Sequence, residues 1–355
     1  CTRIGYNQRM AHQSLYRTHR PATFAEVVGQ EQVTKPLEEA AKSKKIGHAY
    51  LFAGSRGLGK TSVARIFASA IGCTENDLYE IDAASNNSVE DIRTLTEGVY
   101  TLPFASPYKV YILDEAHMLS RSAWNAFLKT LEEPPAYAVF ILATTELEKV
   151  PETVQSRCQV FEFKKPTRAV LAKMATAVAT KEGYTLAPTA AELIALLGDG
   201  SYRDALSVLQ KVFAATEEKT LSREVVEQAT GAPRQEQVHA LVSALAEGER
   251  GKALAAIEQA AKADADMELF LELVLEALRA TLLIRYAPEL RASLQNELGA
   301  DEFSALENVG RGTSYITHAT MLAFLTAAER IRYAPIPALP LELAVLELFP
   351  DELQK

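Results

Sequence analysis

The sequence is poor in cysteine: only Cys1, Cys73 and Cys158 occur among 355 residues. Three scattered cysteines cannot build a disulfide framework, and no Cys-x-x-Cys pair is present to begin a zinc site. The six histidines also lack the spacing of metal ligands. The sequence therefore gives no support for zinc.

Long apolar runs are missing as well. No stretch approaches the ~18 consecutive apolar residues of a membrane-spanning helix. The first nine residues hold no apolar segment suited to secretion, and Met10 is a plausible natural start, so we give residues 1–9 no function. These absences predict a cytoplasmic protein without a membrane partner.

The chain has no excess of positive charge. Its net charge is −9, and residues 1–166 hold 19 basic and 19 acidic residues, so the whole acidic excess lies in residues 167–355. Contacts with phosphates supply most non-specific affinity for nucleic acids, so this chain is not a typical autonomous nucleic-acid binder. We expect any DNA contact to use a local patch in the first half, with partners supplying the rest.

Short apolar runs alternate with helical patterns in the first half of the chain. The runs typical of strands lie at residues 49–53, 78–81, 109–113 and 138–143, and the helical patterns between them at 61–71, 88–99 and 120–131. This alternation predicts βαβ units and a parallel sheet. The third and fourth runs are apolar throughout, as expected of central strands covered on both faces.

Strands are expected to stop after about residue 166, where helical patterns take over. These patterns lie at residues 168–182, 188–197, 201–215, 222–229, 265–286, 313–333 and 341–348. A chain of this length should form two or three domains. We predict an N-terminal extension (1–15), an α/β domain (16–166), a small helical domain (167–232) and a larger helical domain (233–355).

A phosphate-binding motif follows the first predicted strand. Gly54-Ser55-Arg56-Gly57-Leu58-Gly59-Lys60-Thr61 matches G-x-x-x-x-G-K-[ST] at every fixed position, and Ser62 continues into a predicted helix. Glycines let backbone N–H groups turn toward phosphates, and the helix directs its positive end at them. Lys60 would neutralise the β- and γ-phosphates and Thr61 would hold Mg²⁺. The motif predicts binding of ATP with Mg²⁺.

Two carboxylates end the third predicted strand. Asp114 would coordinate the Mg²⁺ water shell, and Glu115 would orient or deprotonate the attacking water. Ligands of open α/β folds bind at this edge of the sheet. The letters DEAH at 114–117 also spell the box of a helicase class. That class needs a second strand-rich domain, which residues after 166 do not offer, so we reject that interpretation.

Further segments resemble one family closely. They lie at 16–21 (YRTHRP), 24–30 (FAEVVGQ), 48–52 (HAYLF), 80–85 (EIDAAS), 117–120 (HMLS), 128–135 (LKTLEEPP), 142–145 (LATT), 156–158 (SRC) and 200–207 (GSYRDALS). With them the chain resembles the bacterial DNA polymerase III gamma/tau subunits, the AAA+ ATPases of sliding-clamp loaders. The match runs from about Tyr16 to Leu209, and residues 339–344 (LPLELA) give weaker support near the end.

The resemblance implies an α/β AAA+ P-loop domain with a parallel sheet, a small helical lid and an all-α collar for oligomerisation. It implies an ATPase that opens the sliding clamp and loads it onto primer–template DNA. The implied partners are delta-type and delta-prime-type subunits, further copies of this chain, the clamp and DNA.

Individual roles follow from the same motifs. Thr145 would be a first sensor of the γ-phosphate, with Thr144 as the alternative, and Arg203 a second sensor. Arg157 would be an arginine finger inserted into a neighbour's site. Tyr16 and Val28 join the nucleotide-binding set. Without the resemblance, both arginines would be interpreted as surface salt-bridge residues.

One departure from the family concerns zinc. The family usually carries a four-cysteine zinc module before the strand at 78–81, but here only Cys73 remains and the chain passes directly into that strand. The ATPase motifs lie outside this segment.

The sequence indicates contacts with DNA and the clamp less strongly than it indicates the nucleotide site. DNA-binding candidates at the start of the helix after residue 87, where a solvated helix start is the alternative, are Ser85, Asn86, Asn87 and Arg93. A clamp-contacting surface could run from residues 117–120 into Trp124 and Phe127, although helical spacing favours a core position for these two aromatics.

Two other functions stay open. A non-hydrolysing scaffold subunit would have a degraded phosphate loop, whereas Lys60, Thr61, Asp114 and Glu115 are all present. A branch-migration motor would end in a winged-helix domain rather than a helical collar.

Overall fold

The computed structural model describes residues 14–298, 300–310 and 315–349. Most of the predicted N-terminal extension therefore lies outside the described residues. The chain divides into two compact units, Cys1–Tyr184 with Ile194–Gln210, and Thr185–Leu193 with Lys211–Lys355. The predicted domain boundaries after residues 166 and 232 stay predictions.

A five-stranded parallel sheet forms the centre of the first unit, in the order β2-β3-β4-β1-β5. Its strands are β1 (Ala49–Ala53), β2 (Leu78–Asp82), β3 (Lys109–Asp114), β4 (Ala138–Thr144) and β5 (Gln159–Glu162). The four predicted strands are confirmed. The sequence did not indicate β5, which adds an edge strand beside β1.

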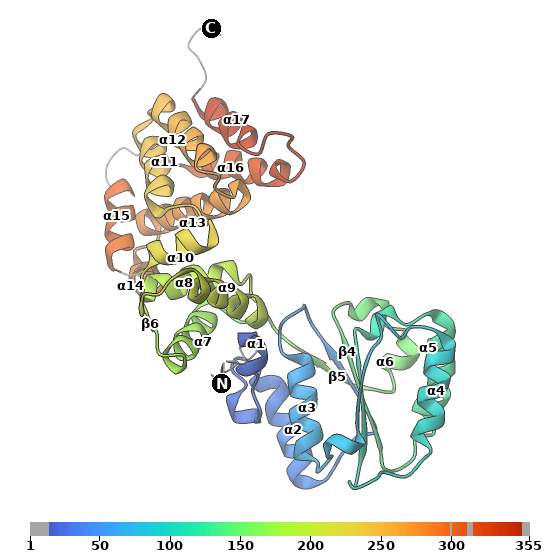
Figure 1. Ribbon diagram of the computed structural model, residues 1–355. Coiled ribbons are helices and arrows are strands. Elements are labelled where there is room, and N and C mark those ends of the chain that lie inside the picture. The colour runs from blue at the N-terminus through green and yellow to red at the C-terminus, as the bar shows by residue number, and fades with distance from the viewer. Residues whose placement is uncertain (1–13, 299, 311–314, 350–355) are drawn as a thin grey trace, which may run out of the picture. The chain divides into compact units, whose positions relative to one another are not determined.

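Helices cover both faces of this sheet (Figure 1). The helices up to residue 215 are α1 (Leu15–Thr18), α2 (Glu31–Ser43), α3 (Lys60–Ala70), α4 (Val89–Val99), α5 (Arg121–Glu132), α6 (Glu152–Gln155), α7 (Arg168–Lys181), α8 (Pro188–Leu197) and α9 (Tyr202–Ala215). The residues of α8 and α9 are divided between the two units. Helices α2 and α3 lie on one face, and α4 and α5 on the other.

Alternation along the strands divides the core between the two faces. Tyr50 and Phe52 of β1 pack with the residues of α2 and α3, whereas Leu51 packs with those of α4 and α5. Trp124 and Phe127 belong to this second cluster and are 3% and 0% exposed. These two aromatics are core residues, as helical spacing favoured, and they are not available as a clamp-contacting surface.

Helices dominate the second unit. They include α10 (Arg223–Thr230), α11 (Gln235–Glu247), α12 (Arg250–Lys262), α13 (Met267–Tyr286), α14 (Arg291–Leu298), α15 (Ala300–Gly310), α16 (His318–Ile331) and α17 (Leu339–Leu348). The start of the helix predicted at 313–333 lies partly outside the described residues. Two short strands, β6 (Thr185–Leu186) and β7 (Thr220–Leu221), pair in parallel, so the expectation that strands stop at residue 166 is wrong here.

Helix α17 is apolar on more than one side. Leu341 and Val345 are fully buried inside the unit, while Leu343 and Leu346 are 47% and 43% exposed. A helix that is apolar all round is usually covered on all sides in its working state. None of the described helices is long and apolar enough to cross a bilayer.

Candidate nucleotide-binding site

The phosphate loop joins β1 to α3 and is held closely on both sides. The Gly54 N–H donates to the Thr144 carbonyl at the end of β4, over 3.2 Å. Gly57 has φ of +77°, and a Cβ built there would lie 2.0 Å from Ser201 Oγ. The Tyr202 N–H donates to the Gly57 carbonyl at 3.1 Å. Only glycine fits at this point, because α9 begins against the loop.

Lys60, the first residue of α3, lies inside the loop. Its side chain is buried, and Nζ donates to the carbonyls of Gly54 and Ser55 at 2.6 and 2.9 Å. Burial lowers the pKa of Lys60, while the nearby carboxylates of Glu115 and Asp114 oppose that shift. An ammonium in this position is ready to meet phosphate oxygens, which would compensate for its desolvation.

Thr61 and Asp114 bring two kinds of oxygen ligand together beside the loop. Thr61 Oγ1 donates to Asp114 Oδ2 at 2.7 Å, and the Glu115 N–H donates to Asp114 Oδ1 at 3.0 Å. Hydroxyl and carboxylate oxygens are the ligands that Mg²⁺ prefers. The donor set therefore fits the Mg²⁺ that the sequence predicted, and Thr61 and Asp114 are the residues that would hold it.

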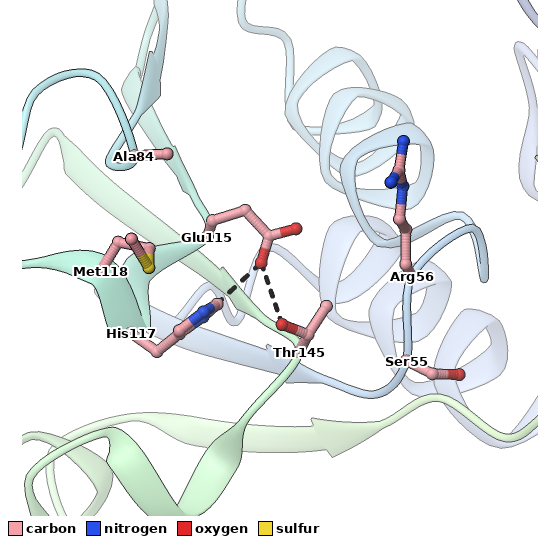
Figure 2. A pocket seen from close by; sticks show the side chains of 7 residues that line it. All are labelled: Ser55, Arg56, Ala84, Glu115, His117, Met118 and Thr145. Carbon is pink, nitrogen blue, oxygen red and sulfur yellow. Dashed lines mark hydrogen bonds and ion pairs between the residues drawn. The ribbon is translucent and has the colours of Figure 1, made fainter. Parts of the chain in front are cut away.

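Glu115 projects into a cavity next to this pair (Figure 2). The cavity measures about 460 Å³, and its lining residues are Ser55, Arg56, Ala84, Glu115, His117, Met118 and Thr145. Thr145 Oγ1 donates to Glu115 Oε2 at 3.1 Å. Thr144, the alternative first sensor, is fully buried. Of the two threonines, Thr145 therefore faces the cavity.

Arg203 lies on the first turn of α9, close to the loop. Its guanidinium carbon is 5.5 Å from the centre of the Tyr16 ring, and its Cβ lies 3.4 Å from the position of a Cβ on Gly57. Val28 is half-exposed, and its carbonyl accepts a hydrogen bond from the Tyr202 hydroxyl. The structure thus brings Tyr16, Val28 and Arg203 together at the start of α9, which begins against the loop, although they are distant in the sequence.

Arg20 is a basic residue of the site that motif analysis missed. Its Nε donates to Ser62 Oγ at 2.9 Å. Burial lowers the pKa of Arg20, and the positive charge of Arg65 acts in the same direction. A signal was present, because Arg20 lies in the 16–21 segment that carried the resemblance, but no spacing rule connects it to the loop.

Arg157 lies away from the cavity. Its guanidinium bonds Glu132 and the Thr153 carbonyl, and about a third of its side chain (34%) is exposed. It stands two residues before Gln159, which pairs with Tyr50 near the start of β1, whereas the phosphate loop follows the end of β1. Arg157 is thus at the surface, at the amino edge of the sheet.

Comparisons with known proteins match both ends of this chain. A family model described as DNA polymerase III, delta subunit, matches residues 29–88 and 75–167, and one described as DNA polymerase III subunits gamma and tau domain III matches residues 221–353. DNA polymerase III subunit tau of Bacillus subtilis is 40% identical over 307 residues, which are 81% of this chain and 54% of that protein. The subunit tau of Escherichia coli is 34% identical over 358 residues, covering 95% of this chain and 55% of that protein.

The chain belongs to the DNA polymerase III gamma/tau family. It spans about half the length of these two relatives.

Solved structures support the fold of this gamma/tau-family chain. A point variant of RuvB from Thermotoga maritima is 22% identical, with a TM-score of 0.52 over 64% of this chain and 78% of that chain. The RuvB Holliday junction branch migration motor of the same organism is 21% identical, with the same TM-score and coverage. The predicted fold class, an α/β AAA+ domain with a parallel sheet followed by helical segments, is confirmed.

The DNA-binding candidates lie in and after the turn that follows β2. The Asp82 carboxylate accepts from Ala84 N–H and Ser85 Oγ, and Asn86 donates to the Asp82 carbonyl. The first turn of α4 is capped reciprocally by Ser88 and Asp91. Ser85, Asn87 and Arg93 are exposed. Asp82 and Asp91 place negative charge beside these residues, and their DNA contact stays a prediction.

The cysteines of the described part of the chain are poorly suited to ligate metal. Burial raises the pKa of Cys73 to about 11 and that of Cys158 to about 12. Metal ligation needs the thiolate, which such burial disfavours. Among the described residues, no three His, Cys, Asp or Glu side chains gather as metal ligands.

Proposed function

We propose that this chain is an ATPase subunit of a sliding-clamp loader. The proposal is carried by the convergence of Lys60, the Thr61–Asp114 pair and Glu115 at one loop and one cavity. Each group has a task in phosphoryl transfer, and the chain's family is that of DNA polymerase III gamma/tau.

In this mechanism the protein positions the reactants and stabilises charge. The loop amides and Lys60 would hold the β- and γ-phosphates, and Thr61 and Asp114 would hold Mg²⁺. Bound Mg²⁺ would neutralise charge that develops on the phosphate oxygens. Glu115 would accept a hydrogen bond from the attacking water, and Thr145 holds that carboxylate from the other side. Arg203 would contact phosphate from within the same chain.

The proposed partners are delta-type and delta-prime-type subunits, further copies of this chain, the sliding clamp and primer–template DNA. ATP binding would favour the assembly that opens the clamp, and DNA-stimulated hydrolysis would release the closed clamp. The match of residues 221–353 to gamma and tau domain III supports an assembly role for the helical region.

The two alternatives receive less support. The intact loop and carboxylate pair disfavour a non-hydrolysing scaffold. The likeness to a branch migration motor is one of fold at 21% identity, whereas the C-terminal helices match a gamma and tau domain.

The decisive experiment measures ATP hydrolysis by this chain alone, with delta-type subunits, and then with clamp and primed DNA added stepwise. We expect slow turnover for the isolated chain and strong stimulation by the complete mixture. A flat response to every addition would remove the clamp-loader assignment.

Arg157 gives a prediction specific to an assembled site. We expect Arg157→Ala to leave ATP affinity within a few-fold but to abolish DNA-stimulated turnover, because a trans-acting arginine supplies roughly 10³–10⁵ in rate. Glu132→Gln, which removes the charge of the carboxylate that pairs with Arg157, is the matched control and should keep stimulation. Nucleotide titration and steady-state ATPase assays separate the effects; equal losses of affinity and turnover would contradict the role.

A further inference from the structure

His117 lies beside Glu115 in the wall of the cavity (Figure 2). Its side chain is only 7% exposed, and Nδ1 is 3.5 Å from Glu115 Oε2 and 3.2 Å from Thr144 Oγ1. On the other side of the ring, Nε2 is 3.3 Å from Glu146 Oε1. One imidazole therefore stands between two carboxylates from different segments.

The segment after β4 is fixed independently of His117. The Glu146 N–H donates to Thr144 Oγ1 at 3.0 Å, and Glu146 Oε2 pairs with Lys149 Nζ at 2.7 Å. The hydrogen bond from Lys149 lowers the pKa of Glu146, so this carboxylate is a lasting acceptor for Nε2–H. Glu146 and Thr144 thus hold the imidazole ring of His117 in a fixed position.

The Glu115 side chain needs partners that fix its position, because the backbone of this residue is unusual. It adopts a left-handed conformation with φ of 48° and ψ of 43°, between β3 and the short helix η3 (Ala116–Met118). Non-glycine residues in this region are strained and persist when their surroundings hold them. His117 and Thr145 reach the same oxygen, Oε2, from two sides.

We propose that His117, with a proton on both ring nitrogens, is a positioning residue: Nδ1–H aims the Glu115 carboxylate, and Nε2–H ties it to Glu146 on the segment after β4. The role rests on the proposed ATPase function, in which Glu115 handles the attacking water. His117 itself takes no proton from water, since its ring nitrogens face Glu115, Thr144 and Glu146.

The kinetic test compares His117→Ala, His117→Asn and His117→Gln in the complete DNA-stimulated assembly. Losing an orienting partner typically costs 10–100-fold, so we expect kcat of the alanine variant to fall by at least roughly 10-fold while KM for ATP changes less than about 2-fold. The Asn amide nitrogen can replace Nδ1, so His117→Asn should recover more kcat than His117→Gln. His239→Asn changes another histidine that pairs with a carboxylate, Glu302, outside the cavity; it is the control and should resemble wild type.

A second measurement needs neither ATP nor hydrolysis. In protein labelled with ¹⁵N-histidine, the ring signals of His117, assigned by their loss in His117→Asn, should shift in both Glu115→Gln and Glu146→Gln but not in His239→Asn. Unchanged signals in Glu115→Gln, or a His117→Ala variant with wild-type kcat, would overturn the proposal. Parallel loss of kcat, ATP affinity and thermal stability would also overturn it, in favour of a purely structural role.

The kinetic and NMR experiments distinguish a failure of the proposed ATPase function from a failure of the proposed role of His117. An inactive wild-type assembly would refute the proposed function, and the nucleotide-free NMR comparison would still confirm or refute the contact between His117 and Glu115.

Discussion

Gly57 is the tightest point between the phosphate loop and α9. Its positive φ and the 2.0 Å approach of Ser201 Oγ both oppose any side chain there. The close approach of Ser201, the residue that precedes α9, links the loop to this helix and so to Arg203. The shape of the loop is therefore constrained by its contact with the start of α9.

Gly57→Ala should destabilise the nucleotide-free protein. A left-handed alanine costs about 1 kcal/mol, and the forced shift of Ser201 adds roughly 1–3 kcal/mol. Gly183→Ala is the matched control, because Gly183 has φ of +79° with nothing within 4 Å of a built Cβ. Urea unfolding of both variants measures the difference; equal destabilisation would show that Ser201 moves away freely.

Residues of the site were predictable where the chemistry is local in sequence. The spacing of residues in the sequence identified the loop from Gly54 to Thr61 and the Asp114–Glu115 pair. The structure brings the two together. Arg20 reaches the site only through tertiary packing. His117 is close to Glu115 in the sequence, but only the fold shows that its ring nitrogens face Glu115 and Glu146. The roles of Thr145, Arg157 and Arg203 stay predictions.

At the scale of elements, the buried carboxylate of Asp77 holds the segment between α4 and β3 in place. Asp77, at the end of the short helix η2 (Glu75–Asp77), accepts from the backbone N–H groups of Phe104, Ala105 and Ser106. Burial alone would raise the pKa of Asp77, but these donors hold it below its ordinary value. The carboxylate thereby fixes the segment that enters β3.

Asp77→Asn should lower the free energy of unfolding by about 2 kcal/mol at pH 7, because charge-assisted bonds to the backbone are lost. A folded-state pKa below the unfolded one gives stability that is complete above the unfolded pKa of about 3.9 and is lost as pH falls through the folded value. Urea unfolding of wild type and variant should therefore converge below pH 4. A difference that persists at low pH would contradict this account.

The elements that the sequence revealed are those with a strong pattern. Strands β1, β3 and β4 are continuous apolar runs buried on both faces, and all were predicted. Strand β5 has only four residues at a sheet edge and is mostly exposed, so its pattern is weak. Helix α2 was not predicted either; Pro36 lies inside it, and proline normally argues against a helix interior.

At the scale of the whole molecule, α17 gives the clearest prediction about assembly. Introducing charge at its exposed leucines, as in Leu343→Asp with Leu346→Asp, should weaken association with partner subunits. The new carboxylates would have to lose their hydration when this apolar face is buried. Leu290→Asp changes a leucine of similar exposure (42%) elsewhere in the unit and is the control. Sedimentation velocity with delta-type subunits measures association, and thermal melts check folding. Unchanged association of the double variant would exclude this face from the assembly.

The strand pairing has one further consequence for such an assembly. The phosphate loop leaves the carboxyl edge of the sheet, and Arg157 stands at the amino edge, about 16 Å away along five residues of β1. One arginine side chain cannot span that length, so an arginine finger at Arg157 would reach the phosphate loop of a neighbouring protomer and not that of its own. Two protomers can supply each other's arginine in a two-fold dimer, or each can supply the next one in a head-to-tail ring. In a head-to-tail arc that does not close, one terminal protomer would lack an arginine from a neighbour.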